Sequence, residues 1–132
     1  MENEQTRAEQ LAQMMRGEQE KQLDHQMQGE MLVLCVRGEI DHHSAAYLRA
    51  QADRLIFSLR PHLVRFDLSR VSFMDSAGLG LILGRMRSAK EAGAAFCLYH
   101  PTQRIVTLLQ MAGMDKHIQI EYAPKTTQQS VS

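Results

Sequence analysis

The stretch of the chain with the clearest chemical potential is residues 73–84, which reads FMDSAGLGLILG. It places a carboxylate, Asp75, and a hydroxyl, Ser76, directly before an apolar run that is interrupted by glycines. Such a pair could serve a nucleophile, a phosphate-binding loop, a helix cap or a site that another protein modifies. The neighbouring residues discriminate between these chemistries.

Nucleophilic catalysis and nucleotide binding each require a pattern that this stretch lacks. The hydrolase elbow is G-x-S-x-G, but Met74 occupies the first glycine position, and no histidine lies in a recognisable triad context. The spacing Gly78-x-Gly80-x-x-x-Gly84 has one residue too many for a dinucleotide fingerprint, and the Lys-Ser/Thr pair of a P-loop is missing. We therefore expect no catalytic residue and no cofactor, and we interpret the glycines as points of close approach to the sheet or a partner.

A phosphorylation site agrees better with the sequence. If Asp75 caps a helix, Ser76 stands at its first position with the hydroxyl exposed. The positive end of the helix dipole tolerates a phosphate, so modification need not unfold the protein. It would add a charge of about −2 to a surface of small and apolar side chains and repel a partner that docks there. We therefore predict that Ser76 is a phosphoacceptor in an electrostatic switch.

A second polar loop, Gly38–His43 (GEIDHH), precedes another candidate helix. Adjacent His42 and His43 suggest a metal site, but neighbouring helical side chains point about 100° apart, and no Cys or carboxylate cluster at ligand spacing accompanies them. Asp41 is better explained as a helix cap, and we expect no metal. Since ligand sites in α/β sheets form where strands end, this loop and the Ser76 loop can share one edge and form a composite surface.

The pattern of the remaining chain predicts the elements that position these loops. Alternating apolar residues from Leu23, a turn at 28–30 and the run MLVLCVRG predict a β-hairpin. We expect the later elements to be a helix that ends at Leu59, a strand at 62–68, a turn at Ser69-Arg70 with an apolar link at 71–74, a helix at 76–92 closed by Gly93, a strand at 95–99, a helix at 102–111 and a strand at 117–120. This alternation predicts an α/β fold with a mostly parallel sheet and right-handed crossovers.

Three smaller features have ordinary structural interpretations. Basic side chains of the second helix form a solvated face, methionines near the end of the third helix belong to the core, and the two cysteines are buried thiols of a reducing compartment. These residues are Arg85, Arg87 and Lys90; Met111 and Met114; and Cys35 and Cys97.

Length and charge limit the remaining possibilities. With 132 residues and no net charge, the chain predicts a single domain and no direct DNA binding, which would need an excess of Lys and Arg. Residues 1–28 hold six acids and three bases, and we interpret 1–22 as a polar, solvated extension, with a partner-docking arm as the alternative. The polar tail is 123–132. Without a signal peptide or an apolar run of about 20 residues, a soluble cytoplasmic protein without a membrane span is expected.

Two separated motifs carry a family resemblance. GEIDHHSAAYL (38–48) and SFMDSAGLGLILGRM (72–86), in this order and spacing, closely resemble the anti-anti-sigma factors of the STAS family, and most of all the sporulation antagonists of anti-sigma-F factors. The resemblance covers residues 23–122. It implies a mixed four- to five-stranded sheet with helices packed mainly on one side, and a regulatory protein rather than an enzyme.

The resemblance also implies a mechanism. In this family the serine after the loop aspartate, here Ser76, is phosphorylated by an anti-sigma factor that is a nucleotide-bound serine kinase. The unphosphorylated antagonist binds that kinase and releases the sigma factor, the phosphorylated form does not bind, and a PP2C-type phosphatase resets the switch. By similarity, the partner-binding face comprises Asp41, His42, His43, Met74, Asp75, Ala77, Gly78 and Leu79.

Two departures and two alternatives complete the expectation. The acidic, Gln-rich extension 1–22 is longer than the family needs. Related antagonists often carry a second hydroxyl where this chain has Ala77, so Ser76 is the only hydroxyl in the loop 75–78. The chain could instead be a STAS scaffold or ligand-sensing module of a larger assembly that is never phosphorylated. An esterase-like enzyme would need turnover that is lost in Ser76→Ala.

Overall fold

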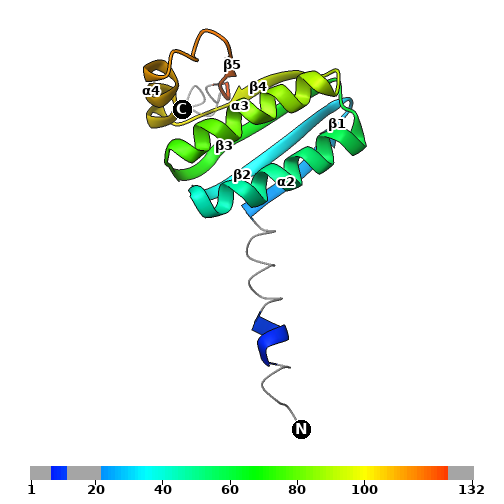
Figure 1. Cartoon of the computed structure of the whole chain (residues 1–132). Coiled ribbons are helices and arrows are strands. Elements are labelled where there is room, and N and C mark those ends of the chain that lie inside the picture. Colours follow the sequence, from blue (N-terminus) through cyan, green and yellow to red (C-terminus); the bar gives the residue numbers. More distant parts are fainter. Residues whose placement is uncertain (1–6, 12–21, 125–132) are drawn as a thin grey trace, which may run out of the picture.

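The computed structural model of the chain describes residues 7–11, which are helical, and residues 22–124, which form the folded domain (Figure 1). Most of the extension predicted at 1–22 and of the tail predicted at 123–132 therefore lies outside the described residues. The elements of the domain are β1 (Leu23–Gln28), β2 (Met31–Ile40), α2 (His42–Leu59), β3 (Leu63–Met74), α3 (Ser76–Glu91), β4 (Ala95–Tyr99), α4 (Gln103–Met111) and β5 (Gln119–Glu121).

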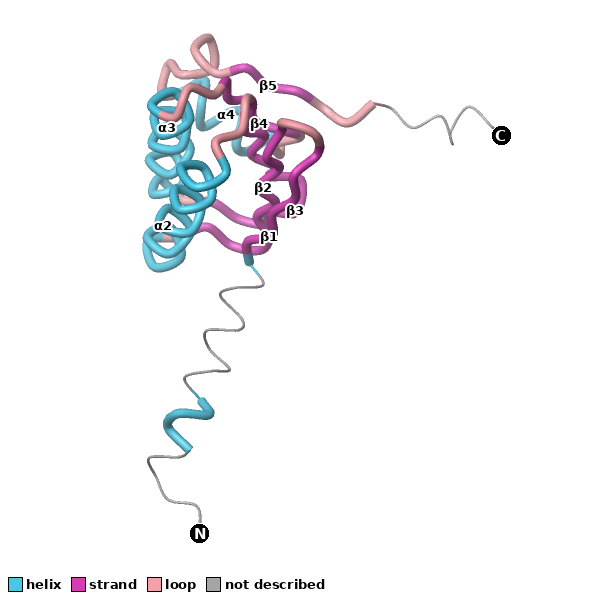
Figure 2. Tube along the Cα trace, turned by 90° about the vertical axis from the view of Figure 1, so that its right-hand side faces the viewer, coloured by secondary structure: helices cyan, strands magenta, loops and turns pink. Residues whose placement is uncertain are grey.

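The five strands form one mixed sheet in the order β1-β2-β3-β4-β5. The β1–β2 pair is antiparallel, and the other three pairs are parallel. Each new strand is added on the same side of the previous one, so crossovers of one hand place their helices on one face of the sheet. Figure 2 shows α2 and α3 together on that face. The predicted fold class, a mixed α/β sheet with helices mainly on one side, is confirmed.

The core lies between this sheet face and the helices. Alternate residues of β2 and β3 are fully buried there, and helical residues at spacings of three and four cover them. The largest fully buried side chains are Phe66, Leu32, Leu34, Ile40, Leu48, Ile56, Leu68, Met74, Ile82, Leu98, Ile105 and Leu109. Since Ile105 and Leu109 of α4 belong to the same cluster, the helices α2, α3 and α4 of the folded domain share one core.

The predicted turn at Ser69-Arg70 is wrong, because β3 runs through it without a break to Met74. Residues 70–74 continue to pair with β2, after a register irregularity near Arg37. The Asp67 carboxylate accepts hydrogen bonds from the backbone N–H and the hydroxyl of Ser69, at 2.9 and 2.7 Å. Such local side-chain bonds are typical of turns, which explains why the sequence around Ser69 resembles one. The chain stays extended because its backbone pairs with β2 by hydrogen bonds.

Three further expectations need correction. Arg85 does not belong to a solvated face: it is 4% exposed, and its Nε lies 3.1 Å from Oδ1 of Asp53 on α2. Met111 is 79% exposed and not in the core, although Met114 packs against the core as expected. The last strand covers 119–121 and not 117–120, since residues 117 and 118 lie in the preceding turn.

Other local predictions agree with the structure. Gly29 makes the hairpin turn with φ 63°, and Gly93 follows the end of α3 with φ 83°, a backbone region that glycine enters without strain. Both cysteines are free thiols; Cys97 is buried and Cys35 is half-buried.

Candidate functional site

The two polar loops lie side by side at one edge of the sheet. β2 and β3 are parallel neighbours whose last paired residues are Ile40 and Met74, so the loops that follow leave the sheet together. The backbone N–H of Asp75 donates a 3.1 Å hydrogen bond to the carbonyl oxygen of Ile40. The composite surface expected from the sequence therefore exists.

Ser76 is the first residue of α3 and is exposed. Asp75 is the N-cap with extended backbone, and its Oδ1 accepts a 2.8 Å hydrogen bond from the N–H of Ala77. The first turn of α3 contains no acidic residue, so the helix dipole meets one carboxylate at its cap. The hydroxyl of Ser76 thus stands at a positive helix end that favours an added phosphate.

Asp41 caps α2 in a more complete arrangement. Its Oδ1 accepts hydrogen bonds from the N–H groups of Ser44 at 2.9 Å and His43 at 3.0 Å. The hydroxyl of Ser44 in turn accepts a 3.0 Å bond from the N–H of Asp41, which completes a capping box. These bonds, first that from the backbone of Ser44, lower the pKa of the Asp41 carboxyl. The loop is therefore held rigidly against the start of α2.

The adjacent histidines project from the first turn of α2. His42 and His43 are both exposed, and their rings meet edge to face with centroids 5.9 Å apart. In the ranges 7–11 and 22–124, no three His, Cys, Asp or Glu side chains are grouped as a metal site would require.

Met74 and Gly78 lie beneath the surface of the Ser76 loop. Met74 is 1% exposed, and a Cβ added to buried Gly78 would overlap with Cγ and Sδ of Met74. The family resemblance predicted both residues on the partner-binding face. Because they are buried, they determine how closely the start of α3 packs on the end of β3, but they expose little side-chain surface to a partner. The other expected residues are accessible: His42 and His43 are exposed, and Asp41, Asp75, Ala77 and Leu79 are partly exposed.

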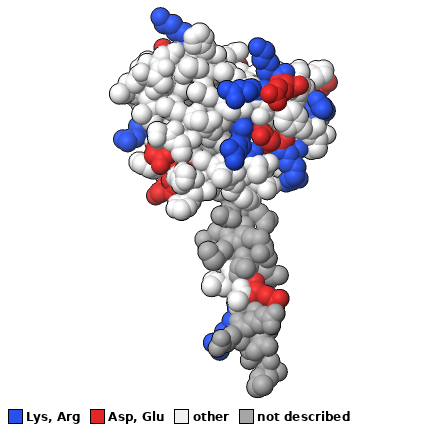
Figure 3. All heavy atoms as spheres, in the orientation of Figure 1, with Lys and Arg blue, Asp and Glu red and all other residues white. Residues whose placement is uncertain are grey.

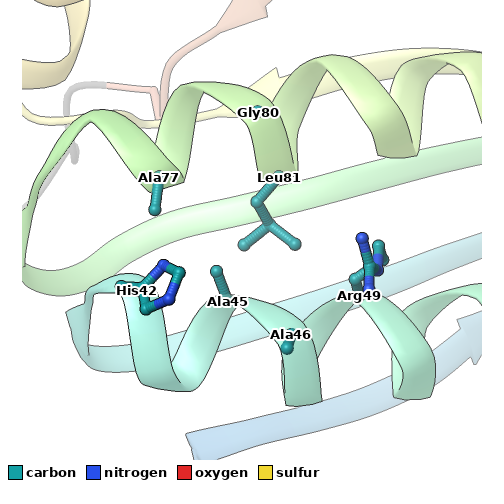
Figure 4. Close-up of a pocket in the computed structure, with 7 residues that line it drawn as sticks. All are labelled: His42, Ala45, Ala46, Arg49, Ala77, Gly80 and Leu81. Atoms are coloured by element: carbon teal, nitrogen blue, oxygen red, sulfur yellow. The ribbon is translucent and has the colours of Figure 1, made fainter.

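A groove of about 360 Å³ lies between α2 and α3 beside the Ser76 loop (Figure 4). It is lined by His42, Ala45, Ala46, Arg49, Ala77, Gly80 and Leu81. The sequence predicted His42 and Ala77 on the partner-binding face and Gly80 as a point of close approach to the sheet or a partner, but it did not indicate the other four residues. The available signal for Ala45 and Ala46 was their small size near the start of α2, but the helical period alone does not show that they face α3.

Charges are unevenly distributed around this region. On the face seen in Figure 3, uncharged side chains cover most of the left part of the domain, with a few Asp or Glu side chains toward the lower left, while side chains of both signs gather toward the right. Figures 1 and 3 share an orientation in which both polar loops lie toward the left. A phosphate on Ser76 would therefore add to the negative charge that Asp41 and Asp75 already bring to this surface.

Comparison with known proteins defines the class. The model of the STAS domain family matches residues 22–130, so the chain belongs to the STAS domain family. The chain is 34% identical over 85 residues to the anti-sigma F factor antagonist of Lysinibacillus sphaericus, covering 64% of this chain and 73% of that protein. Among the described residues, no helix has the length and apolarity needed to span a membrane.

Solved structures agree with this assignment. The anti-sigma factor antagonist SpoIIAA in its unphosphorylated form is 29% identical and superimposes with a TM-score of 0.66 over 83% of this chain and 92% of SpoIIAA. The phosphorylated form of the Bacillus cell fate determinant SpoIIAA gives a TM-score of 0.63 at 29% identity, over 83% of this chain and 96% of that chain. The domain thus resembles an antagonist known in two phosphorylation states.

Proposed function

We propose that this protein is an anti-sigma factor antagonist whose activity is switched by phosphorylation of Ser76. The observation that carries the proposal is the position of Ser76, an exposed hydroxyl at the start of α3 on the surface that two loops share. The relatives named as anti-sigma factor antagonists support the same assignment. The protein would act by binding and not by catalysis.

In the unphosphorylated state, the composite surface binds an anti-sigma factor that is also a nucleotide-bound serine kinase, and the sigma factor is released. The kinase transfers the γ-phosphoryl group of its nucleotide to the Ser76 oxygen, and the hydroxyl proton leaves. The product carries about −2 of charge beside the Asp75 carboxylate. This charge disfavours a second docking event, because a like-charged or apolar partner surface must desolvate it.

A phosphatase of the PP2C type resets the switch by hydrolysing the phosphoserine. The accessible position of Ser76 supports this step, since both enzymes must reach the same oxygen. The antagonist therefore cycles in the cytoplasm between two partners, without contacting DNA or the membrane itself.

The proposal is tested by measuring the affinity of the anti-sigma factor kinase from the same organism for three variants by calorimetry. We expect Ser76→Ala to bind like the unmodified protein, and Ser76→Asp to bind roughly tenfold or more weakly, the effect of about 1.4 kcal/mol. Ser58→Asp is the matched control, since Ser58 is exposed at the opposite end of α2.

Equal affinities of Ser76→Asp and Ser58→Asp would contradict charge as the switch. If the kinase also fails to phosphorylate the wild type, the chain is better explained as a STAS scaffold or ligand-sensing module.

A further inference from the structure

The groove between α2 and α3 continues directly from the loop that holds Ser76. Ala77 lies at one end and Arg49 at the other, and His42 faces Ala77 across the gap in Figure 4. Leu81 contributes an apolar side chain that is 4% exposed. A partner that covers Ser76 would therefore extend naturally over this groove.

The groove is open at Gly80, and packing within the domain does not require a glycine there. No heavy atom lies within 4 Å of the position that a Cβ at Gly80 would take. Glycine inside a helix is destabilising relative to alanine. The missing side chain at Gly80 therefore has no explanation in the fold of the domain, and it leaves room for another molecule.

The end of the groove at Arg49 lacks negative charge. Among residues 7–11 and 22–124, no carboxylate lies within ion-pair distance of Arg49. The nearby carboxylate of Asp53 already pairs with Arg85, whose Nε and Nη1 are buried without a hydrogen-bond partner of good geometry in this part of the chain. Burial lowers the pKa of Arg85, Asp53 opposes that effect, and the positive charge of Arg49 adds to it. Within the described part of the chain, the carboxylate of Asp53 is therefore used by Arg85, and Arg49 has no ion-pair partner.

We propose that this groove receives an apolar side chain of the anti-sigma factor kinase, and that a neighbouring carboxylate of the kinase pairs with Arg49. The alanines, Gly80 and Leu81 of the lining suit an apolar group. The guanidinium of Arg49, which has no ion-pair partner among residues 7–11 and 22–124, suits an acidic one. The inference rests on the function proposed above and names the chemistry of the partner surface. It makes Arg49 and Gly80 determinants of partner choice that are distinct from the phosphoacceptor.

The shape of the groove is tested with Gly80→Leu and its matched control, Gly84→Leu. Both positions are open for a Cβ and lie one turn apart on α3, but only Gly80 lines the groove. We expect Gly80→Leu to weaken binding of the kinase at least tenfold and to slow phosphorylation of Ser76, while Gly84→Leu binds like the wild type. Thermal melts of both variants serve as the control that each is folded. Equal losses, or no loss, would overturn the assignment of the groove.

The charge requirement is tested with Arg49→Glu against Arg54→Glu. Arg54 is exposed on the same helix, outside the groove, and donates a 2.8 Å hydrogen bond to Gln51. We expect Arg49→Glu to weaken binding at least tenfold at low salt, with the loss shrinking as salt rises, and Arg54→Glu to have little effect. Similar affinities of the two variants would contradict the pairing.

Binding and phosphorylation of the wild type distinguish failure of this inference from failure of the proposed function. A wild type that neither binds the kinase nor accepts phosphate on Ser76 contradicts the function itself. If the wild type binds the kinase and accepts phosphate, and the groove variants bind as tightly as the wild type, only the proposed role of the groove is contradicted.

Discussion

The hydrogen bond from the backbone N–H of Asp75 to the carbonyl oxygen of Ile40, 3.1 Å long, ties the start of one helix to the end of the neighbouring strand. It extends the β2–β3 ladder by one bond, so the loops at Asp41 and Ser76 leave the sheet from a common, fixed base. Since the bond uses only backbone atoms, the carboxylate of Asp75 remains available to cap α3 at Ala77. The surface that the two loops share is therefore attached directly to the β2–β3 ladder.

The contact between Gly78 and Met74 predicts opposite effects of two Gly→Ala substitutions. At Gly78 a Cβ overlaps with the buried Met74 side chain, so we expect Gly78→Ala to lower the free energy of unfolding by about 1–3 kcal/mol. At Gly84 the space is open, and Gly84→Ala should raise it by up to about 1 kcal/mol. Urea unfolding measures both free energies. Stabilisation by Gly78→Ala would contradict the prediction, because it would show that Met74 leaves room for a side chain at position 78.

The buried pair of Arg85 and Asp53 predicts an asymmetric pair of variants. Asp53→Ala leaves the Arg85 side chain, which is 5% exposed, without its carboxylate. We expect the free energy of unfolding to fall by about 3 kcal/mol, at the low end for such pairs because the Asp53 side chain is 31% exposed. Arg85→Met removes the charge but keeps much of the packing, so its loss should be clearly smaller. Chemical unfolding of the two single variants and the double variant measures these free energies. A larger loss of stability in Arg85→Met than in Asp53→Ala would contradict the prediction.

The capping role of Asp41 predicts a dependence of stability on pH. Its folded pKa is lowered by the N–H bonds of Ser44 and His43, so its contribution is present above the unfolded value of about 3.9 and is lost as the pH falls through the folded pKa. We expect Asp41→Ala to melt at a lower temperature than the wild type at pH 7, with the difference shrinking below about pH 4.

Asp41→Asn serves as the control for this experiment, since asparagine caps helices nearly as well but does not titrate. It should melt close to the wild type at pH 7 and lack the acid-dependent component. A constant difference between Asp41→Ala and the wild type from pH 7 to pH 3 would contradict the assigned role.

Phosphorylation of Ser76 is expected to change binding without changing the fold. The added charge lies at an exposed first helical position, where the dipole favours it and the Asp75 carboxylate opposes it. The free energy of unfolding should therefore shift by no more than about 1 kcal/mol. Circular dichroism and thermal melts of the phosphorylated and unmodified protein measure this shift. A large destabilisation would mean that the switch works by local unfolding.

The sequence predicted the parts of the fold that depend on local patterns. Alternation in β2, the helical period after Asp41 and the cap at Asp75 are local signals, and these elements are present in the structure. The turn predicted at Ser69-Arg70 was wrong because the strand is held there by pairing with β2, which is distant in sequence.

Side-chain environments were harder to predict for the same reason. A basic residue on a helix is usually solvated, but Arg85 faces α2, where Asp53 pairs with it. Arg49 and Gly80 join one groove only because α2 and α3 pack side by side, and no spacing within either helix indicates that. The Ser76 loop could be proposed as a site from the sequence because its residues are contiguous.

The most direct test of the central claim is phosphorylation-site mapping by mass spectrometry after incubation of the full-length protein with the anti-sigma factor kinase and ATP. The account predicts one added phosphate, on Ser76, that is absent from Ser76→Ala and present in Ser58→Ala. A phosphate that persists in Ser76→Ala, or a wild type that remains unmodified by a kinase it binds, would contradict it.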